Sequence, residues 1–426
     1  MQFSAEVLDH IFSFVESQRT LVACSQDSVL YPIVERHLYY HTTVHFASGW
    51  LDSDCSFEPD SLSKFISENP RILNYVRILQ VHVELDRVGT QDAAIKKQLD
   101  EFAKTLSTFP LLECIMLTTS KKRVWNWPDV FRATLEDRLK LPTVKEVHLV
   151  GYQDFPLSLI NKCKNIENLL LSGQSYADDD DSTPLQLKSL TLSDTSNSGL
   201  ESVLLHIKKL QSLKCAASSV DGLPELLEVC SEALNKLDID LTYSRCKTHV
   251  FLLIVNDATT EILDPSNYTF RTGKVDYNPF PELTPIPPNL QQLTICAPIC
   301  VENGLDEDLI CIPQRCDSYL PAVAEIIKLF ISPPQHLILD INIHLFGFSS
   351  NLANVDFSPL AVLGDAALSI PRIDLYVHTG ILPSDITFAQ VFSSLADYGG
   401  ILKSIEEGIL FIHSEKTAPD YYLKDD

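Results

Sequence analysis

One pattern of apolar residues returns along most of this chain and constrains its fold more than any other feature. Each copy is a triplet with the spacing i, i+3, i+5, and in several copies the residues in between are polar, as Lys188, Ser189 and Thr191 are around Leu190. The last two positions of a triplet alternate as in a strand with one buried face, and the first position falls in the turn that precedes the strand. The triplets are Val76-Leu79-Val81, Leu112-Ile115-Leu117, Val144-Val147-Leu149, Ile166-Leu169-Leu171, Leu187-Leu190-Leu192, Leu210-Leu213-Cys215, Leu234-Leu237-Ile239, Leu290-Leu293-Ile295 and Ile370-Ile373-Leu375.

The distance between triplets indicates a repeat architecture. From Val144 to Leu234 successive triplets begin 22, 21, 23 and 24 residues apart. This period matches a leucine-rich repeat, in which a short strand is followed by a helical return. A single repeat cannot bury its apolar face, so repeats must stack on one another. We therefore predict an α/β fold, a leucine-rich-repeat-like solenoid with parallel strands over residues 76–412. The period breaks at an irregular insertion at about 243–289, which is dense in proline.

Helical periodicity predicts the remaining elements. Residues 1–45 read as three short helices, the second beginning near Thr20 and the third after Pro32. Residues 46–75 are predicted as a helical transition, with a helix over 61–69 that Pro70 ends. We expect a last strand at 409–412 and a flexible tail over 413–426. The predicted return helices are 90–108, 128–139, 158–163, 200–210, 224–233, 321–331 and 386–395.

Composition and charge restrict the partners and the compartment. The chain has 426 residues and a formal net charge of −24, which repels phosphate backbones and anionic membranes. Neither a signal peptide nor a run of about 18 apolar residues is visible in the sequence. We expect no nucleic-acid or membrane partner and a cytoplasmic and/or nuclear location. In that reducing compartment the 11 cysteines should be thiols, mostly buried.

Residues that could carry chemistry are few. The sequence contains no nucleophile elbow, phosphate-binding glycine loop or zinc-protease helix motif, so we expect a protein that is not an enzyme, without catalytic residues or cofactors. Cys296, Cys300, Cys311 and Cys316 could meet around a metal, but their spacing is wider than in common zinc knuckles, and we expect no metal site. No two of the histidines on or beside strands share a ligand-like spacing with a carboxylate. Trp125 and Trp127 fit either a partner-binding hot spot or core filling.

The first residues carry a family likeness. The segment from Phe3 to Phe14, FSAEVLDHIFSF, resembles the opening of an F-box, whose usual form is L-P-x-E-[LIV]-L-x-x-I-F-S-[FY]-L. Residues 21–25 and 32–39 are similar to its second and third helices. Two departures are visible: Phe3-Ser4 replaces the Leu-Pro pair, and residues 26–30 replace the stretch that usually carries a tryptophan. Ser4 is still suited to begin a helix, because its hydroxyl can cap free N–H groups.

The resemblance implies a function. F-box proteins with irregular leucine-rich repeats are abundant in fungi, and this chain is similar to that group. Such proteins dock on a Skp-type adaptor of a cullin–RING ubiquitin ligase and capture a protein target on their repeats. The alternative is a repeat scaffold without a ligase role, in which residues 1–45 cap the solenoid. A third class, a small-ligand sensor or hydrolase, would need a deep polar pocket. The resemblance implies adaptor contacts at Phe3, Val7, Leu8, Ile11, Phe12, Leu21 and Val22.

Overall fold

The structure, a computed structural model, shows an α/β protein with parallel strands. The chain divides into two compact units, residues 1–209 and residues 210–426, which are described separately. The described residues are 4–15, 18–46, 56–83, 92–124, 127–153, 155–156, 158–161, 163–172, 176–177, 186–193, 207–216, 223–241, 287–302, 315–318, 320–329, 334–346, 357–366, 369–379 and 399–415.

The first unit begins with three helices, α1 (Ala5–Phe12), α2 (Gln18–Ser25) and α3 (Tyr31–Leu38), at the positions predicted. Strand β1 (His41–Phe46) follows directly, so the parallel strands begin well before Val76, and the prediction of helix up to residue 45 was wrong at its end. The segment HTTVHF alternates strictly, with every second side chain buried, which is the pattern of a strand with one covered face. Such a short alternation directly after a helix was missed.

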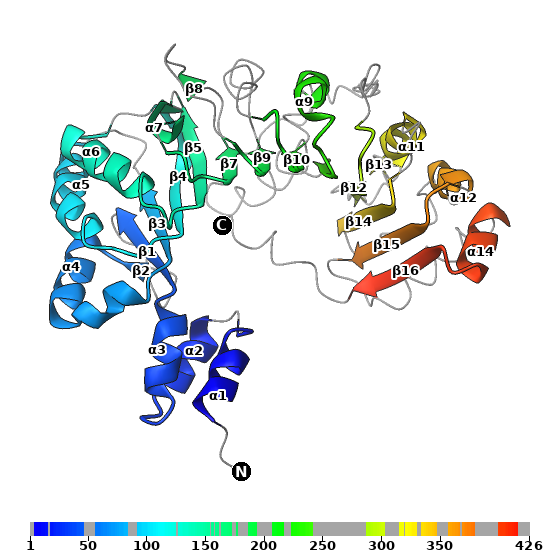
Figure 1. Cartoon of the computed structure of the whole chain (residues 1–426). Coiled ribbons are helices and arrows are strands. Elements are labelled where there is room, and N and C mark those ends of the chain that lie inside the picture. Colours follow the sequence, from blue (N-terminus) through cyan, green and yellow to red (C-terminus); the bar gives the residue numbers. More distant parts are fainter. Residues whose placement is uncertain are drawn as a thin grey trace, which may run out of the picture. The chain divides into compact units, whose positions relative to one another are not determined.

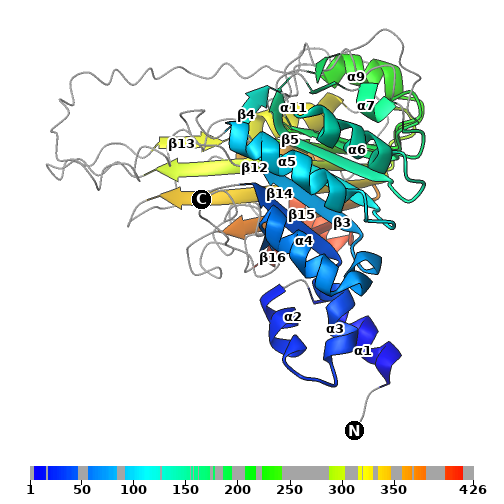
Figure 2. The same ribbon diagram turned by 90° about the vertical axis from the view of Figure 1, so that its left-hand side faces the viewer.

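The strands of the first unit lie side by side in nearly their sequence order. The order of neighbours is β9-β7-β5-β4-β3-β1-β2, and each strand pairs in parallel with the next. The helices α4, α5 and α6 cover one face of these strands (Figures 1 and 2). The strands are β2 (Ser56–Phe57), β3 (Ile78–Val83), β4 (Cys114–Val124), β5 (Glu146–Gln153), β7 (Asn168–Ser172) and β9 (Ser189–Ser193), with a separate parallel pair of β6 (Phe155–Pro156) and β8 (Tyr176–Ala177). The helices are α4 (Pro59–Glu68), η1 (Pro70–Asn74), α5 (Asp92–Leu106), α6 (Asp129–Leu139) and α7 (Ser158–Asn161).

The second unit repeats this arrangement. Its strands follow the order β16-β15-β14-β12-β11-β10 and pair in parallel, while β13 (Arg315–Ser318) pairs antiparallel with β12. Helices α11, α12 and α14 lie beside β14, β15 and β16 (Figure 1). The strands are β10 (Ser212–Ala216), β11 (Lys236–Asp240), β12 (Gln292–Glu302), β14 (His336–Phe346), β15 (Arg372–Thr379) and β16 (Leu410–Glu415). The helices are α9 (Leu223–Cys230), α11 (Leu320–Leu329), η6 (Ser358–Ala361), α12 (Val362–Ala366) and α14 (Gly399–Glu406).

The apolar triplets form the core of both units, as predicted. Every residue of the nine triplets is buried, with at most 5% of its surface exposed. The parallel register places equivalent positions of successive triplets next to one another, so that the core is a set of continuous apolar rows. Burial of a leucine-sized side chain contributes about 1.5–3 kcal/mol, and these rows therefore hold the strands together. In the first unit one such row is Leu79, Ile115, Val147, Leu169 and Leu190.

A second periodic feature lies one residue after the first position of each triplet. The backbone N–H of Glu113 donates to the carbonyl of Arg77, and the same bond joins Lys145 to Glu113, Glu167 to Lys145 and Lys188 to Glu167, at 2.7–2.9 Å. The side chains along this row alternate in charge, and ion pairs join Arg77 to Glu113 at 3.2 Å and Lys188 to Glu167 at 2.6 Å. Exposed ion pairs stabilise a protein little, so the backbone bonds set the stacking and the charges complement it.

The predicted helices are confirmed where the structure describes them, except that residues 207–210, the end of the helix predicted over 200–210, form a turn. Helices are present in the ranges 61–69, 90–108, 128–139, 158–163, 224–233 and 321–331. The range 386–395 lies outside the described residues, as do 200–206 and most of the insertion predicted at 243–289. The tail was predicted to begin too early, because β16 continues to Glu415 and includes His413. No helix among the described residues has the length and apolar character that crossing a bilayer demands.

The structure decides between the two interpretations of Trp127, a partner-binding hot spot and core filling. Its ring packs edge-on against Phe131 of α6 at 4.8 Å and against Tyr152 of β5 at 5.3 Å between centroids. The side chain is buried, and it joins the return helix to the strands. The partner-binding alternative is therefore wrong for Trp127, while Trp125 lies outside the described residues.

Candidate functional site

The exposed apolar side of α1 is the first candidate site. Val7 is 44% exposed, Ile11 45% and Phe14 72%. Val7 and Ile11 are one helical turn apart, and Phe14 continues the same side just after the helix ends. We call these three residues the α1 face. Large apolar side chains that share one side of a helix and remain in solvent are typical of a protein-binding surface.

The other apolar residues of α1 hold the three helices together. Phe12, Leu21, Val34 and Leu38 form a buried cluster, and Leu8, Val15 and Val22 pack against it. On α1 these residues lie about 100° around the helix from the α1 face. Of the adaptor contacts implied by the resemblance, Val7 and Ile11 are therefore exposed, Leu8 and Val22 are partly covered, and Phe12 and Leu21 are interior. Phe3 lies outside the described residues.

Polar contacts fix the orientation of α1. Asp9 forms ion pairs with Arg36 and, at 2.6 Å, with His37, both on α3. Ser4 occupies the N-cap position, yet no side-chain cap bond forms, contrary to the expectation that its hydroxyl would cap the helix. Instead, the backbone N–H of Glu6 and the Ser4 hydroxyl both bond to the Glu6 carboxylate and lower its pKa. The helix is held by its contacts with α3 and the shared core.

The helices also connect to the strands through α3. Glu35 on α3 is buried, and it accepts hydrogen bonds from Arg71 of η1 at 2.9 Å and from Tyr31 at 3.0 Å. Tyr39 packs its ring against Phe65 of α4 at 5.3 Å. Because these contacts involve α3 and the residue that follows it, they leave the α1 face free of them.

The second candidate site is the strand face opposite the return helices, which we call the open strand face. It consists of the outward side chains that alternate with the buried triplet residues, and in both units these are mainly polar. The polar residues between the apolar positions of three triplets are partly or fully exposed, as the alternation within the triplets predicts. They are Lys188, Ser189, Thr191, Gln211, Lys214, Gln291, Gln292 and Thr294.

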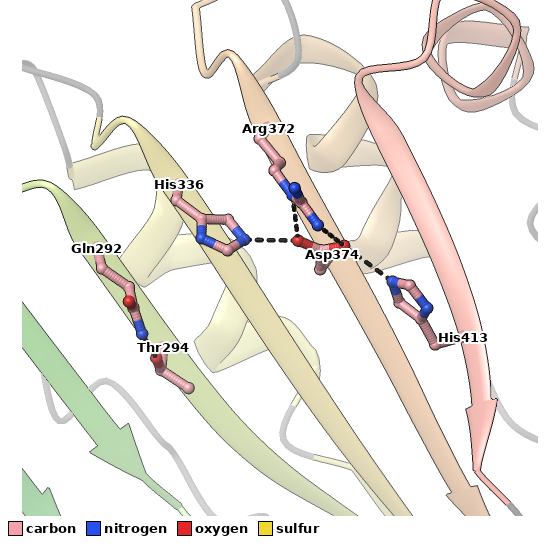
Figure 3. A network of polar contacts seen from close by, with 6 residues as sticks. All are labelled: Gln292, Thr294, His336, Arg372, Asp374 and His413. Atoms are coloured by element: carbon pink, nitrogen blue, oxygen red, sulfur yellow. Dashed lines mark hydrogen bonds and ion pairs between the residues drawn. The ribbon is translucent and has the colours of Figure 1, made fainter.

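In the second unit the open strand face carries a buried carboxylate. Asp374 on β15 is 1% exposed, because Arg372, His336 and His413 surround it (Figure 3). His336 on β14 lies 2.5 Å from Asp374, and His413 on β16 lies 2.8 Å away on the other side. The Arg372 Nε–H donates to the same carboxylate at 2.8 Å. The sequence separates these residues by 38 and 39 positions, and its local motifs do not reveal the cluster.

The ionisation of Asp374 should make stability depend on pH. Burial opposes the charged form, but hydrogen bonds from Arg372, His413 and His336 outweigh it and hold the pKa of Asp374 well below its ordinary value. A carboxylate whose pKa is lower in the folded than in the unfolded protein stabilises the folded state at pH values above its unfolded pKa, which is about 3.9. This stabilisation is lost as the pH falls below about 3.9 toward the folded pKa. We expect Asp374→Asn to lower stability by roughly 1–3 kcal/mol at pH 7, and the difference to shrink below about pH 4. Unfolding in urea between pH 3 and pH 7 measures it, and a difference that does not vary with pH would contradict the assignment.

Of the four cysteines considered as metal ligands, Cys296 is the one whose side chain the structure describes. Cys296 lies on the open strand face between two buried neighbours, Ile295 and Ala297, and is partly exposed rather than in the core. Burial of its sulfur and the charges of Asp340 and Asp240 raise the pKa of Cys296 to about 12. Cys311 lies outside the described residues, and Cys300 and Cys316 fall in β12 and β13. The six cysteines whose surroundings the structure describes are free thiols, as expected.

The structure brings together a different set of donors, which the sequence analysis missed. Cys114 on β4 lies beside Glu146 and His148 on β5, and one ligand atom of each lies within 4.8 Å of the other two. The signal was present as the pair Glu146-x-His148, since residues two apart on a strand point to the same face. The expectation for the strand histidines concerned pairs of them, so it did not cover His148 alone beside Glu146.

Comparison with known proteins does not identify the chain. No protein-family model matches the sequence, and a search of curated proteins finds no match. The α1 face and the open strand face are therefore the features of the molecule from which a function can be inferred.

Proposed function

We propose that this protein is the substrate-recognition subunit of a Skp–cullin–F-box type ubiquitin ligase. In this proposal α1, α2 and α3 form an F-box-like domain, and the strands and return helices form a leucine-rich-repeat-like solenoid. The observation that supports it best is the α1 face, on which Val7, Ile11 and Phe14 remain exposed while the other apolar residues of α1 pack into a core. An F-box needs such a surface to bind its adaptor.

The proposed role requires no reacting residue in this chain. The α1 face would hold a Skp-type adaptor, and the open strand face would hold a protein target, so that the ligase brings the ubiquitin-conjugating enzyme close to a lysine of the target. Tethering both partners raises their effective concentration for each other. A row of polar side chains on parallel strands suits this role, because its residues vary without disturbing the buried triplets.

The alternative is a repeat scaffold in which the three helices cap the first strands. A cap buries its apolar stripe against the repeat it shields. Here the described helices build a core from their own residues, and α3 supplies the contacts to α4 and η1. This arrangement favours the adaptor-binding proposal over the cap, since the α1 face is left to an external partner.

Co-purification with a Skp-type adaptor tests the proposal. We expect Val7→Asp combined with Ile11→Asp to weaken adaptor binding by about 100-fold or more, because two apolar contacts of about 1.5 kcal/mol each are lost. These positions are preferable to Leu8, whose packing against the core would confound binding with unfolding. Circular dichroism confirms that the variant is folded.

A control uses another exposed apolar residue of the helical region. Val29 is 71% exposed in the turn before α3, and Val29→Asp places one of the same charged side chains away from the α1 face. This variant should bind the adaptor as the natural protein does. Equal binding by the folded double variant would refute the ligase proposal, and failure of the natural protein to bind any Skp-type adaptor would favour the scaffold.

The target is found by comparing pull-downs of the full chain with those of a truncated chain. The truncation should begin after α3 and keep β1, because removing His41–Phe46 would expose the edge of β3. We expect targets to be retained by the truncated chain and the adaptor to be lost. Targets that disappear with the three helices would contradict capture by the open strand face.

A further inference from the structure

The cluster of Cys114, Glu146 and His148 lies on the open strand face of the first unit. Cys114 begins β4 and pairs in register with Glu146 of β5, while His148 is two residues further along β5 and points to the same side. The sulfur, a carboxylate oxygen and an imidazole nitrogen all lie within 4.8 Å of one another. Among the residues that the structure describes, no other group of three or more such side chains has this metal-like spacing.

Hydrogen bonds order two members of the cluster. His148 Nε2 lies 2.6 Å from the Glu146 carboxylate. The hydrogen bond from His148 lowers the pKa of Glu146, and this effect outweighs burial, which acts in the opposite direction. The side chain of Asn168 on β7 contributes a further hydrogen bond that lowers the pKa. Such an outer hydrogen bond orients a carboxylate, as the partners of metal-binding carboxylates do. Cys114 is buried beside this pair, and burial together with the charge of Glu146 raises the pKa of its thiol to about 12, so the thiol is protonated before any ion binds.

We propose that Cys114, Glu146 and His148 bind a zinc ion. Thiolate, imidazole and carboxylate together form a borderline-soft donor set that zinc accepts, whereas calcium and magnesium prefer oxygen alone. On binding, the Cys114 thiol releases one proton to solvent, and the imidazole nitrogen and a carboxylate oxygen turn from each other to the ion. The thiolate and the carboxylate then balance the charge of Zn²⁺, which makes a neutral cluster suited to a half-covered position.

The required movements are small. Zinc bonds of about 2.0–2.3 Å place tetrahedral ligand atoms about 3.4 Å apart. The present separations are 2.6 Å between His148 and Glu146 and at most 4.8 Å within the cluster, so each changes by no more than about 1.4 Å, an amount on the scale of a side-chain rotation. Three protein ligands leave a fourth position for water, the arrangement of an open zinc site rather than of a closed structural one.

Cobalt titration of the purified full-length protein tests the proposal. Co²⁺ takes zinc sites and reports its ligands by absorption, so we expect a thiolate-to-cobalt charge-transfer band and the visible bands of tetrahedral cobalt, at one ion per chain. Added Zn²⁺ should remove both. A natural protein that shows no thiolate band, or no bound metal by equilibrium dialysis, would overturn the proposal.

Variants locate the ion. Cys114→Ser should abolish the charge-transfer band, while Glu146→Gln keeps the thiol and should weaken zinc binding by more than the roughly 10–100-fold that loss of an outer partner costs. Cys296→Ser is the matched control, because it removes another cysteine of the open strand face and should leave the band unchanged. If circular dichroism shows that Cys114→Ser is unfolded, the variants Glu146→Gln and His148→Ala test the site in its place. A band that survives these two changes places the metal elsewhere and refutes the site.

Discussion

Replacing Leu171 by aspartate is expected to unfold the first unit of this protein. Leu171 on β7 is fully buried, and its register neighbours are Leu149 on β5 and Leu192 on β9. The change removes a buried leucine, which costs about 2–5 kcal/mol, and places an unpaired carboxylate in the apolar row. A total loss of roughly 4 kcal/mol or more is comparable with the whole stability of a domain, about 5–15 kcal/mol. Urea unfolding and limited proteolysis measure it.

The same substitution at the adjacent residue, Leu170, tests the opposite face of β7. Leu170 points to the open strand face and is partly exposed. Leu170→Asp should change stability by less than about 1 kcal/mol, because the new charge remains in water. Similar losses in the two variants would show that β7 does not have one buried and one open face, and the account of the triplets would fail with it.

Replacing Gly151 by alanine is expected to cause the second large loss, about 2–4 kcal/mol. Gly151 on β5 has φ +83°, a conformation that L side chains rarely adopt. A Cβ atom there would lie 2.6 Å from the carbonyl oxygen of Thr119 and 2.7 Å from its Cγ2. The position coincides with the irregularity in the β4–β5 pairing, where the register shifts between Thr118 and Arg123. The substitution therefore strains both strands at their most irregular point.

Gly408 separates the two causes of this loss. Its φ is +70°, yet nothing lies within 4 Å of an added Cβ. Gly408→Ala should therefore cost only the conformational part, about 1 kcal/mol, and Gly408→Asn still less, because asparagine tolerates a positive φ. Gly151→Asn should remain destabilised by its contact with Thr119. Thermal unfolding of the four variants measures this, and equal losses at the two positions would contradict the close approach.

The two surfaces differ in how far the sequence could predict them. The apolar stripe of α1 was visible, but it covers both sides of the helix, so periodicity did not reveal that Leu8 and Phe12 face the core while Val7 and Ile11 face solvent. That choice depends on where α3 packs, which Asp9 fixes through Arg36 and His37. The outward positions of the strands were predicted correctly because alternation is local.

The clusters on the open strand face could not be predicted in the same way. Asp374 meets His336 and His413 because the register of three parallel strands puts each histidine two residues from the position opposite Asp374. The lengths of the segments between the strands vary, so a distance along the chain does not translate into a neighbour across the sheet. Cys114 and Glu146 are neighbours for the same reason.

The sequence by itself determined which side chains are buried in the strands, because burial of one strand face repeats every second residue and leaves a periodic record in the chain. It also indicated the three helices and the parallel α/β arrangement. Only the tertiary structure decided which side of α1 is exposed, where β4 and β5 lose their register at Gly151, and which polar side chains meet. Contacts between strands depend on register and packing, and neither is a local property of the sequence.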